Sequence, residues 1–186
     1  MSSGDGDERP DLTWLSTERL EGERVGPQHR ELVIAILNDP RVAVWLGGVK
    51  PDAERSLQFD RWLAHWDEHG FGPWLLRRRG TAEVVGYVGL MYYTGANLAP
   101  EPGEPTVELL WGLLPAHWRQ GYGTEAAAAV VTVAVEQVAL PKVVAFTMTT
   151  NGASQGVMRA VGMTYVRDFE HADLPHQLYV LRRHVR

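Results

Sequence analysis

The sequence of 186 residues contains no cysteine. Disulfide frameworks, thiolate nucleophiles and cysteine-ligated zinc are therefore excluded, and any thiol chemistry must come from a cofactor. A chain of this length can bury roughly 70% of the surface that its unfolded form exposes, so it needs no disulfide or metal staple. We expect a single folded domain over residues 14–186, preceded by a polar, disordered tail over residues 1–13.

Long apolar runs are absent as well, and the one basic run, Arg77-Arg78-Arg79, is short and is interpreted as a solvated strand end. No segment approaches the roughly 18 consecutive apolar residues of a membrane span, and the acidic start lacks the basic and apolar regions of a signal peptide. These absences favour a cytoplasmic protein without a membrane partner. The formal net charge of -5 argues against nucleic acid as the main partner, because phosphate contacts require clustered Lys and Arg.

Hydrophobic periodicity predicts a mixed α/β fold. Apolar residues at helical spacing predict helices over residues 31–38, 52–69, 123–138 and 153–161, with Gly162 as a left-handed cap of the last. Segments rich in β-branched and aromatic residues predict strands over 71–79, 83–93, 106–114, 142–148, 163–168 and 177–182. The first two strands read as a hairpin, and residues 97–105 as a loop. Helices, a hairpin and a strand–helix–strand unit together indicate a mixed sheet flanked by helices.

A turn with two glycines joins the strand over 106–114 to the following helix. Gly121 and Gly123 allow successive backbone N–H groups to point toward one place, and the start of the helix adds unpaired donors and the positive end of its dipole. Such a turn can hold a pyrophosphate, and Arg119 could add a charge-assisted hydrogen bond. The glycine pair alone is equally compatible with an ordinary tight turn before a helix.

The same turn satisfies the G-x-G-x-x-[GA] pattern of dinucleotide-binding enzymes through Gly121, Gly123 and Ala126. A nucleotide-binding oxidoreductase is therefore a distant alternative. Six residues separate Leu114 from Gly121, although the turn of that fold follows its strand directly, and the next strand ends without an acid for the ribose. No lysine follows the glycines, which excludes a P-loop.

The downstream residues supply a resemblance to a known family. Asn151-Gly152-Ala153-Ser154 and Val161-Gly162-Met163 resemble the N-x-x-S…G-[MF] segment of GNAT acetyltransferases. Further segments resemble the branch that includes RimJ and RimL: Thr17-Glu18-Arg19-Leu20, Asn38-Asp39-Pro40-Arg41-Val42, His69-Gly70-Phe71-Gly72, Val107-Glu108-Leu109 and Trp118 to Ala126. The resemblance covers about residues 15–183. It implies a GNAT fold, with a twisted mixed sheet of six to seven strands, about four flanking helices and splayed central strands that bind acetyl-CoA.

The resemblance implies an acetyl-CoA-dependent N-acetyltransferase that moves an acetyl group to a primary amine by direct attack in a ternary complex. The pantetheine arm of the cofactor would pair with the strand edge at residues 111–113, with Gly112 admitting a close approach. Residues implied to bind the cofactor are Trp111, Leu113, Arg119, Gln120, Gly121, Tyr122, Gly123, Thr124 and Asn151. Plain core packing is the alternative for the Trp111 and Leu113 side chains, and a helix cap is the alternative for Asn151.

Two residues are candidates for catalysis. Glu108 resembles the family acid that receives the proton of the amine, usually through water, and its alternative is a solvent-facing strand carboxylate. Family members often place a tyrosine on the last helix to protonate the leaving thiolate, but the aligned residue here is Met158, which cannot donate. Ser154 remains, either as a donor to the sulfur or as part of the first helical turn. The missing tyrosine keeps a non-catalytic acyl-CoA-binding module open as the alternative function.

The acceptor stays open among a protein N-terminus, a small amine and an antibiotic-like molecule, and a homodimer is compatible with the sequence. No metal site is expected. His65 and His69 lack the H-E-x-x-H arrangement and are interpreted as a surface pair. His171, Asp173 and His176 form a polar cluster that could line the acceptor site or lie in a solvated loop.

Overall fold

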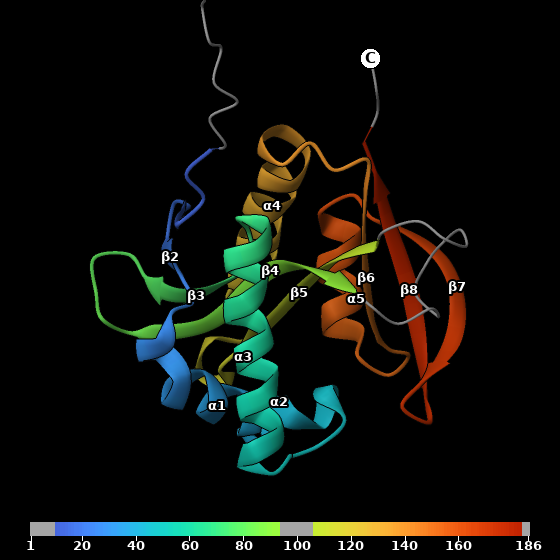
Figure 1. The fold of residues 1–186 in the computed structure, drawn as a ribbon. Coiled ribbons are helices and arrows are strands. Elements are labelled where there is room, and N and C mark those ends of the chain that lie inside the picture. Colours follow the sequence, from blue (N-terminus) through green and yellow to red (C-terminus); the bar gives the residue numbers. More distant parts are fainter. Residues whose placement is uncertain (1–9, 94–105, 184–186) are drawn as a thin grey trace, which may run out of the picture.

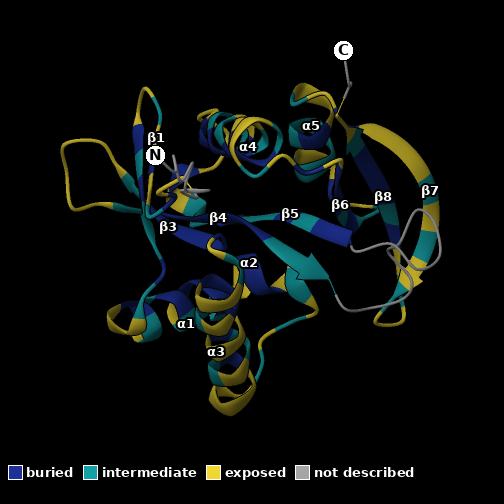
Figure 2. Cartoon of the chain, turned by 45° about the horizontal axis from the view of Figure 1, so that its top comes forward, coloured by how far each residue is buried: buried dark blue, intermediate teal, exposed yellow. Residues whose placement is uncertain are grey.

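The computed structural model describes residues 10–93 and 106–183 (Figure 1). These residues form one eight-stranded mixed sheet in the order β1-β2-β3-β4-β5-β6-β8-β7. Helices α1, α2 and α3 cover one face of the sheet, and α4 and α5 cover the other (Figure 2). The expected mixed α/β arrangement is confirmed, with one strand more than the six to seven expected. The expected loop over 97–105 lies outside the described residues.

The elements alternate along the chain as the GNAT resemblance implies. The strands are β1 (Trp14–Ser16), β2 (Leu20–Arg24), β3 (Pro73–Arg78), β4 (Val84–Tyr93), β5 (Thr106–Leu113), β6 (Lys142–Met148), β7 (Thr164–His171) and β8 (Leu174–Arg182). The α-helices are α1 (Arg30–Asn38), α2 (Pro40–Ala43), α3 (Asp52–His69), α4 (Tyr122–Thr132) and α5 (Gly152–Ala160). Short 3₁₀ turns lie at η1 (Pro27–His29), η2 (Val44–Leu46) and η3 (Pro115–His117), and a π-helical turn, η4 (Val133–Gln137), extends α4.

The two faces of the sheet carry separate cores. Small residues of α4, among them Ala126 and Ala127, let this helix pack closely on one face, where Met158 of α5 is also fully buried. On the other face, Phe59 and Trp62 of α3 pack with Ile36 of α1. The buried positions of α3 are Arg55, Phe59, Trp62, His65 and Trp66, which repeat at helical spacing. The two cores fix α3 and α5 on opposite sides of the central strands.

The N-terminal segment departs most from the sequence-based expectation. β1 and β2 pair antiparallel and extend the sheet beyond β3, although neither shows a clear alternation of apolar and polar residues. Residues 1–9 of the expected tail lie outside the described residues. Leu12, within that expected tail, is buried, and its carbonyl accepts a 2.7 Å hydrogen bond from the Trp74 indole.

A seam divides the sheet between β5 and β6. β5 pairs with β4 along its whole length, from Thr106 to Leu113. Its parallel pairing with β6 consists of one pair of residues, Glu108 and Val144. Beyond this pair the two strands diverge, so the β5 edge from Leu109 onward faces the seam rather than a neighbouring strand. The splay of the central strands matches the expected fold.

Within residues 10–93 and 106–183, no helix combines the length and the apolar character that crossing a membrane requires.

Candidate active site

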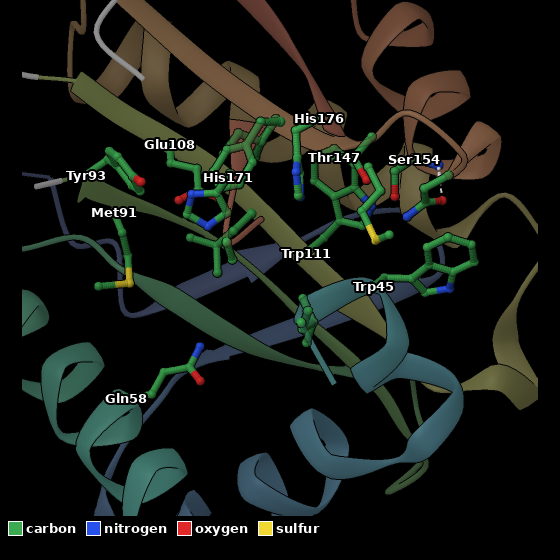
Figure 3. Close-up of a pocket in the computed structure, with 18 of the residues that line it drawn as sticks. Trp45, Gln58, Met91, Tyr93, Glu108, Trp111, Thr147, Ser154, His171 and His176 are labelled. Carbon is green, nitrogen blue, oxygen red and sulfur yellow. Dashed lines mark hydrogen bonds between the residues drawn. The ribbon is translucent and has the colours of Figure 1, made fainter. Parts of the chain in front are cut away.

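A cavity of about 550 Å³ opens where β5 and β6 diverge (Figure 3). Its walls come from η2 and α3 on one side and from β4, β5, β6, the start of α5 and the β7–β8 hairpin on the other. Four of the residues selected from the sequence line it: Glu108, Trp111, Asn151 and Ser154. The cavity therefore joins the candidate catalytic residues of β5 and α5 in one space.

Glu108 lies in the wall of this cavity, beside the last pair that joins β5 to β6. Its side chain is half-buried, and no described residue forms a hydrogen bond or ion pair with its carboxyl group. Desolvation raises the pKa of Glu108 to about 8. A solvent-facing strand carboxylate is thus the wrong interpretation. A carboxyl group with this pKa is matched to exchange a proton with an amine near neutral pH.

Two tyrosines of β4 lie near Glu108 in the same cavity. Burial, and then the negative charge of Glu108, raise the pKa of both Tyr87 and Tyr93, so both phenols stay neutral. A Cβ atom placed on Gly112 would lie 2.5 Å from Cε1 of Tyr87. The ring of Tyr87 thus accounts for a glycine at position 112, where the sequence analysis expected the approach of a cofactor.

Backbone groups of β5 point into the seam. The Leu114 amide donates to the Val85 carbonyl of β4 at 2.9 Å, so by strand alternation the peptide groups of Leu113 and Trp111 are directed away from β4. The Leu113 carbonyl accepts a 2.7 Å hydrogen bond from the Trp118 indole. The N–H group of Leu113 and the N–H and C=O groups of Trp111 therefore point into the seam between β5 and β6.

The glycine turn lies at the far end of this edge. Gly121 has φ 83° and Arg119 has φ 59°, both in the left-handed region. The first hydrogen bond of α4 runs from the Glu125 amide to the Gly121 carbonyl at 3.0 Å, so the amides of residues 122–124 precede it without intrahelical acceptors. A Cβ atom on Gly123 would lie 3.5 Å from Val157 of α5. The turn, the end of β5 and α5 thus meet at one place.

Arg19 holds the same turn in place through its side chain, a role that the sequence analysis missed. Its guanidinium pairs with Glu125 at 2.6 Å, donates to the Gln120 carbonyl at 3.0 Å and stacks 4.6 Å from the Tyr122 ring. Glu125 also accepts from the Thr17 hydroxyl at 2.5 Å. The Thr17-Glu18-Arg19-Leu20 segment was visible in the sequence, but only the fold shows that it reaches the start of α4.

The start of α5 forms the other margin of the seam. The Asn151 side chain accepts a 3.2 Å hydrogen bond from the Ser154 amide and so caps the helix. Both residues also line the cavity, and Figure 3 shows Ser154 at its edge. Met158, one turn later, is fully buried in the core and does not line the cavity. The hydroxyl of Ser154 is thus the donor of α5 that the cavity can reach.

Comparison with known proteins places this arrangement in a family. The model of the acetyltransferase (GNAT) domain matches residues 19–164, which is most of the chain. The protein belongs to the GNAT acetyltransferase family. The FsC-acetyl coenzyme A-N(2)-transacetylase of Aspergillus fumigatus is 32% identical over 158 residues, which are 83% of this chain and 66% of that protein, just under two thirds of its length.

Solved structures agree with the GNAT assignment. The crystal structure of an acetyltransferase from Agrobacterium tumefaciens superposes with a TM-score of 0.79 at 26% identity, covering 97% of this chain and all of that one. The ribosomal alpha-N-protein acetyltransferase RimL, in complex with coenzyme A, superposes with a TM-score of 0.72 over 91% of this chain and 98% of its own. At 15% identity, the RimL match shows the fold alone.

The histidines of this GNAT domain depart from their expected settings. His65 is buried, with Nδ1 2.7 Å from the Phe71 carbonyl and Nε2 accepting from the Tyr92 amide at 2.9 Å. The expected surface pair of His65 and His69 is therefore wrong, because His65 ties α3 to β4. Among the described residues, no group of three or more His, Asp or Glu side chains is placed to hold a metal ion.

His171 and His176 lie on β7 and β8 and line the cavity, so a solvated loop is the wrong setting for both. Asp173 occupies the turn between these strands, with φ 60°. The sequence analysis also missed the α3 wall of the cavity, formed by Arg55, Gln58 and Arg61. Their spacing of three residues on a predicted helix was the available signal, but only the packing shows which face meets the cavity.

Proposed function

We propose that this protein is an acetyl-CoA-dependent N-acetyltransferase that acetylates a primary amine by direct attack in a ternary complex. The observation that supports the proposal is the open edge of β5, which runs from the uncapped start of α4 to Glu108 in the cavity. It offers backbone donors for a phosphate at one end and a proton acceptor at the other.

The residues present fit the cofactor. Acetyl-CoA would supply the acetyl group as an activated thioester. The amides of residues 119–124 would hold its phosphates, with Arg19 and Arg119 as nearby cations. The peptide groups of Trp111 and Leu113 would pair with the pantetheine arm as an added strand does. Asn151 caps α5 through its oxygen, which leaves its NH₂ group to donate toward the seam.

Glu108 would take the proton of the attacking amine, directly or through water. Its raised pKa suits this role, since an α-amino group has an unperturbed pKa of roughly 8. The Ser154 hydroxyl would donate a hydrogen bond to the departing sulfur. A thiolate is already a stable leaving group, with a thiol pKa of roughly 8.5, so a weak donor suffices in place of the tyrosine that Met158 replaces.

The relatives support an amine acceptor. The name of the Aspergillus relative states a transfer from acetyl coenzyme A to a nitrogen, N(2). The sequence motifs favour the RimJ/RimL branch, which would add protein N-termini to the candidate acceptors. We therefore keep both a protein N-terminus and a small amine as acceptor classes.

Two measurements test this function. Calorimetry should show that the protein binds CoA, and mass spectrometry should detect acetylated product when acetyl-CoA is supplied with a panel of small amines and N-terminal peptides. Glu108→Gln should bind CoA normally but lose turnover. CoA binding without product or thiol release across the panel would replace this proposal with a non-catalytic acyl-CoA-binding module.

A further inference from the structure

The α3 wall of the cavity carries three polar side chains at helical spacing. Arg55, Gln58 and Arg61 lie three residues apart, so they share one face of the helix. All three line the cavity, across from the strand residues that carry the proposed chemistry. In Figure 3, Gln58 lies on α3 opposite Glu108 and the two histidines of the β7–β8 hairpin.

Arg55 is a buried cation without a carboxylate partner. Its side chain is buried, and it donates to the Leu37 carbonyl at 3.1 Å, the Gly48 carbonyl at 3.0 Å and the Asn38 side chain at 3.1 Å. These acceptors lie at the end of α1 and after η2, so Arg55 also fixes the η2 segment that lines the cavity. No carboxylate among the described residues forms an ion pair with Arg55, and its hydrogen bonds go to carbonyl and side-chain amide oxygens.

Arg55 also determines what Gln58 presents to the cavity. It donates from Nη1 to Oε1 of Gln58 at 2.8 Å. Because a guanidinium has donors only, the bonded amide atom must be the oxygen, and the NH₂ group of Gln58 is left for a ligand. Arg61 is exposed at the cavity rim, with no partner among the described residues. The α3 wall therefore offers hydrogen-bond donors and positive charge.

The opposite wall offers acceptors. Nδ1 of His176 lies 2.9 Å from the Leu174 carbonyl, which can only accept, so Nδ1 is the donor and the neutral ring has Nε2 as its acceptor. Burial lowers the pKa of His171, which keeps this ring neutral. Glu108 completes this wall and is the one carboxyl group among the described lining residues. Within the described lining, two arginines against a single carboxyl group disfavour a polycationic acceptor.

Aromatic side chains contribute to both walls. Trp45, Trp62, Tyr93 and Phe146 all line the cavity, which suits an apolar or aromatic segment of a ligand. Resting on the proposed acetyltransferase function, we propose that the acceptor is an amphipathic amine with an anionic group, a carboxylate or a phosphate. Its amine reaches Glu108, and its anionic group lies against Gln58 and Arg61.

The test uses arylethylamines that differ only in the para substituent: carboxylate, phosphate, carboxamide or aminomethyl. Each is titrated into the protein with CoA bound, and binding is read from the fluorescence of the cavity tryptophans. Because no acetyl group is present, the affinities do not depend on turnover. A carboxylate or phosphate should bind about tenfold more tightly than the carboxamide, and the doubly cationic amine should bind most weakly. The first two compounds distinguish the two anions.

Arg61→Gln should remove the preference for the anion and leave carboxamide binding unchanged. Gln58→Glu should also remove the preference for the anion, since the new carboxylate pairs with Arg55 and repels an anion. Arg78→Gln, an equal change of charge in the β3–β4 hairpin, is the matched control and should keep the preference. Equal affinity for the anionic and neutral amines, or tightest binding of the aminomethyl compound, overturns the proposed acceptor. Acetyl transfer to the same panel, measured separately, tests the proposed function.

Discussion

Glu108 combines a strand position that the sequence revealed with an environment that only the fold could reveal. The V-E-L pattern of β5 placed it on a strand, and strand alternation left its side chain on either a solvated or a buried face. In the structure its face is that of α3, and the cavity excludes enough water to raise its pKa. Burial thus makes the Glu108 carboxylate a stronger base than a carboxylate on the surface would be.

The pH dependence of turnover tests this role. With an acceptor whose amine pKa lies well below 8, the acceptor stays neutral and kcat/KM of the wild type should rise with an apparent pKa near 8, because only ionised Glu108 accepts a proton. Glu108→Gln should lack this rise and lose about 10²- to 10⁴-fold in rate at high pH. Persistence of the same ionisation in the variant would assign it to another group.

At the scale of elements, the strand–turn–helix unit was the most predictable part of the site. Two glycines and an Ala-rich segment are local signals, and the structure places β5, and α4 with its π-helical extension, close to the expected residues. The α3 wall was not predictable in the same way. Helical spacing predicted the helix but not its inward face. Leu57 is exposed and Arg55 is buried. Contacts with α1 and η2 determine which side chains of α3 point inward. The β1–β2 edge was missed because it carries no regular alternation.

The two glycines of the turn should respond differently to substitution. Gly121→Ala should destabilise the fold by about 1 kcal/mol, because φ 83° is strained for a residue with a Cβ atom. Gly123 lies in the first turn of α4, where a Cβ atom would make ordinary contacts of 3.5 and 3.6 Å. Gly123→Ala should therefore fold as the wild type does, whereas Gly123→Val, which adds two methyl groups beside Leu113 and Val157, should weaken CoA binding at least about tenfold by crowding the phosphate-binding amides.

Thermal unfolding and CoA calorimetry of the two variants separate these effects. Gly123→Ala is the size control and should lie between the wild type and Gly123→Val in CoA affinity. Undiminished CoA affinity in Gly123→Val would remove the start of α4 from the cofactor site.

At the scale of the molecule, His65 should make the fold sensitive to acid. Burial lowers its pKa below 6.5, and both ring nitrogens are engaged, so protonation breaks the bond from the Tyr92 amide. Because the unfolded state binds more protons at this residue, the contribution of His65 to the free energy of unfolding should be fully present above pH 6.5 and fall as the pH drops below it. Urea unfolding at a series of pH values measures this slope.

His65→Gln should be less stable at neutral pH but should lose the part of the slope that lies just below pH 6.5. His69→Gln removes a neighbouring ring that contributes to the lowered pKa of His65 but leaves the His65 hydrogen bonds in place, so this control should keep most of the slope of the wild type. Glu108 titrates identically in both variants, so its opposite contribution cancels in the comparison. An unchanged slope in His65→Gln would show that other groups cause the acid sensitivity.

The seam between β5 and β6 gives the molecule a mechanical asymmetry. Within the sheet, a single pair of residues joins the group of strands β1 to β5 to the group of strands β6, β8 and β7. The two groups of strands can therefore rotate relative to each other about that pair more easily than either group can bend. A pantetheine arm bonded along the β5 edge would bridge the seam and restrict this rotation. Release of the cofactor after each catalytic cycle would restore it. Glu108 lies in that pair, so it would move least while the seam between it and the glycine turn opens and closes.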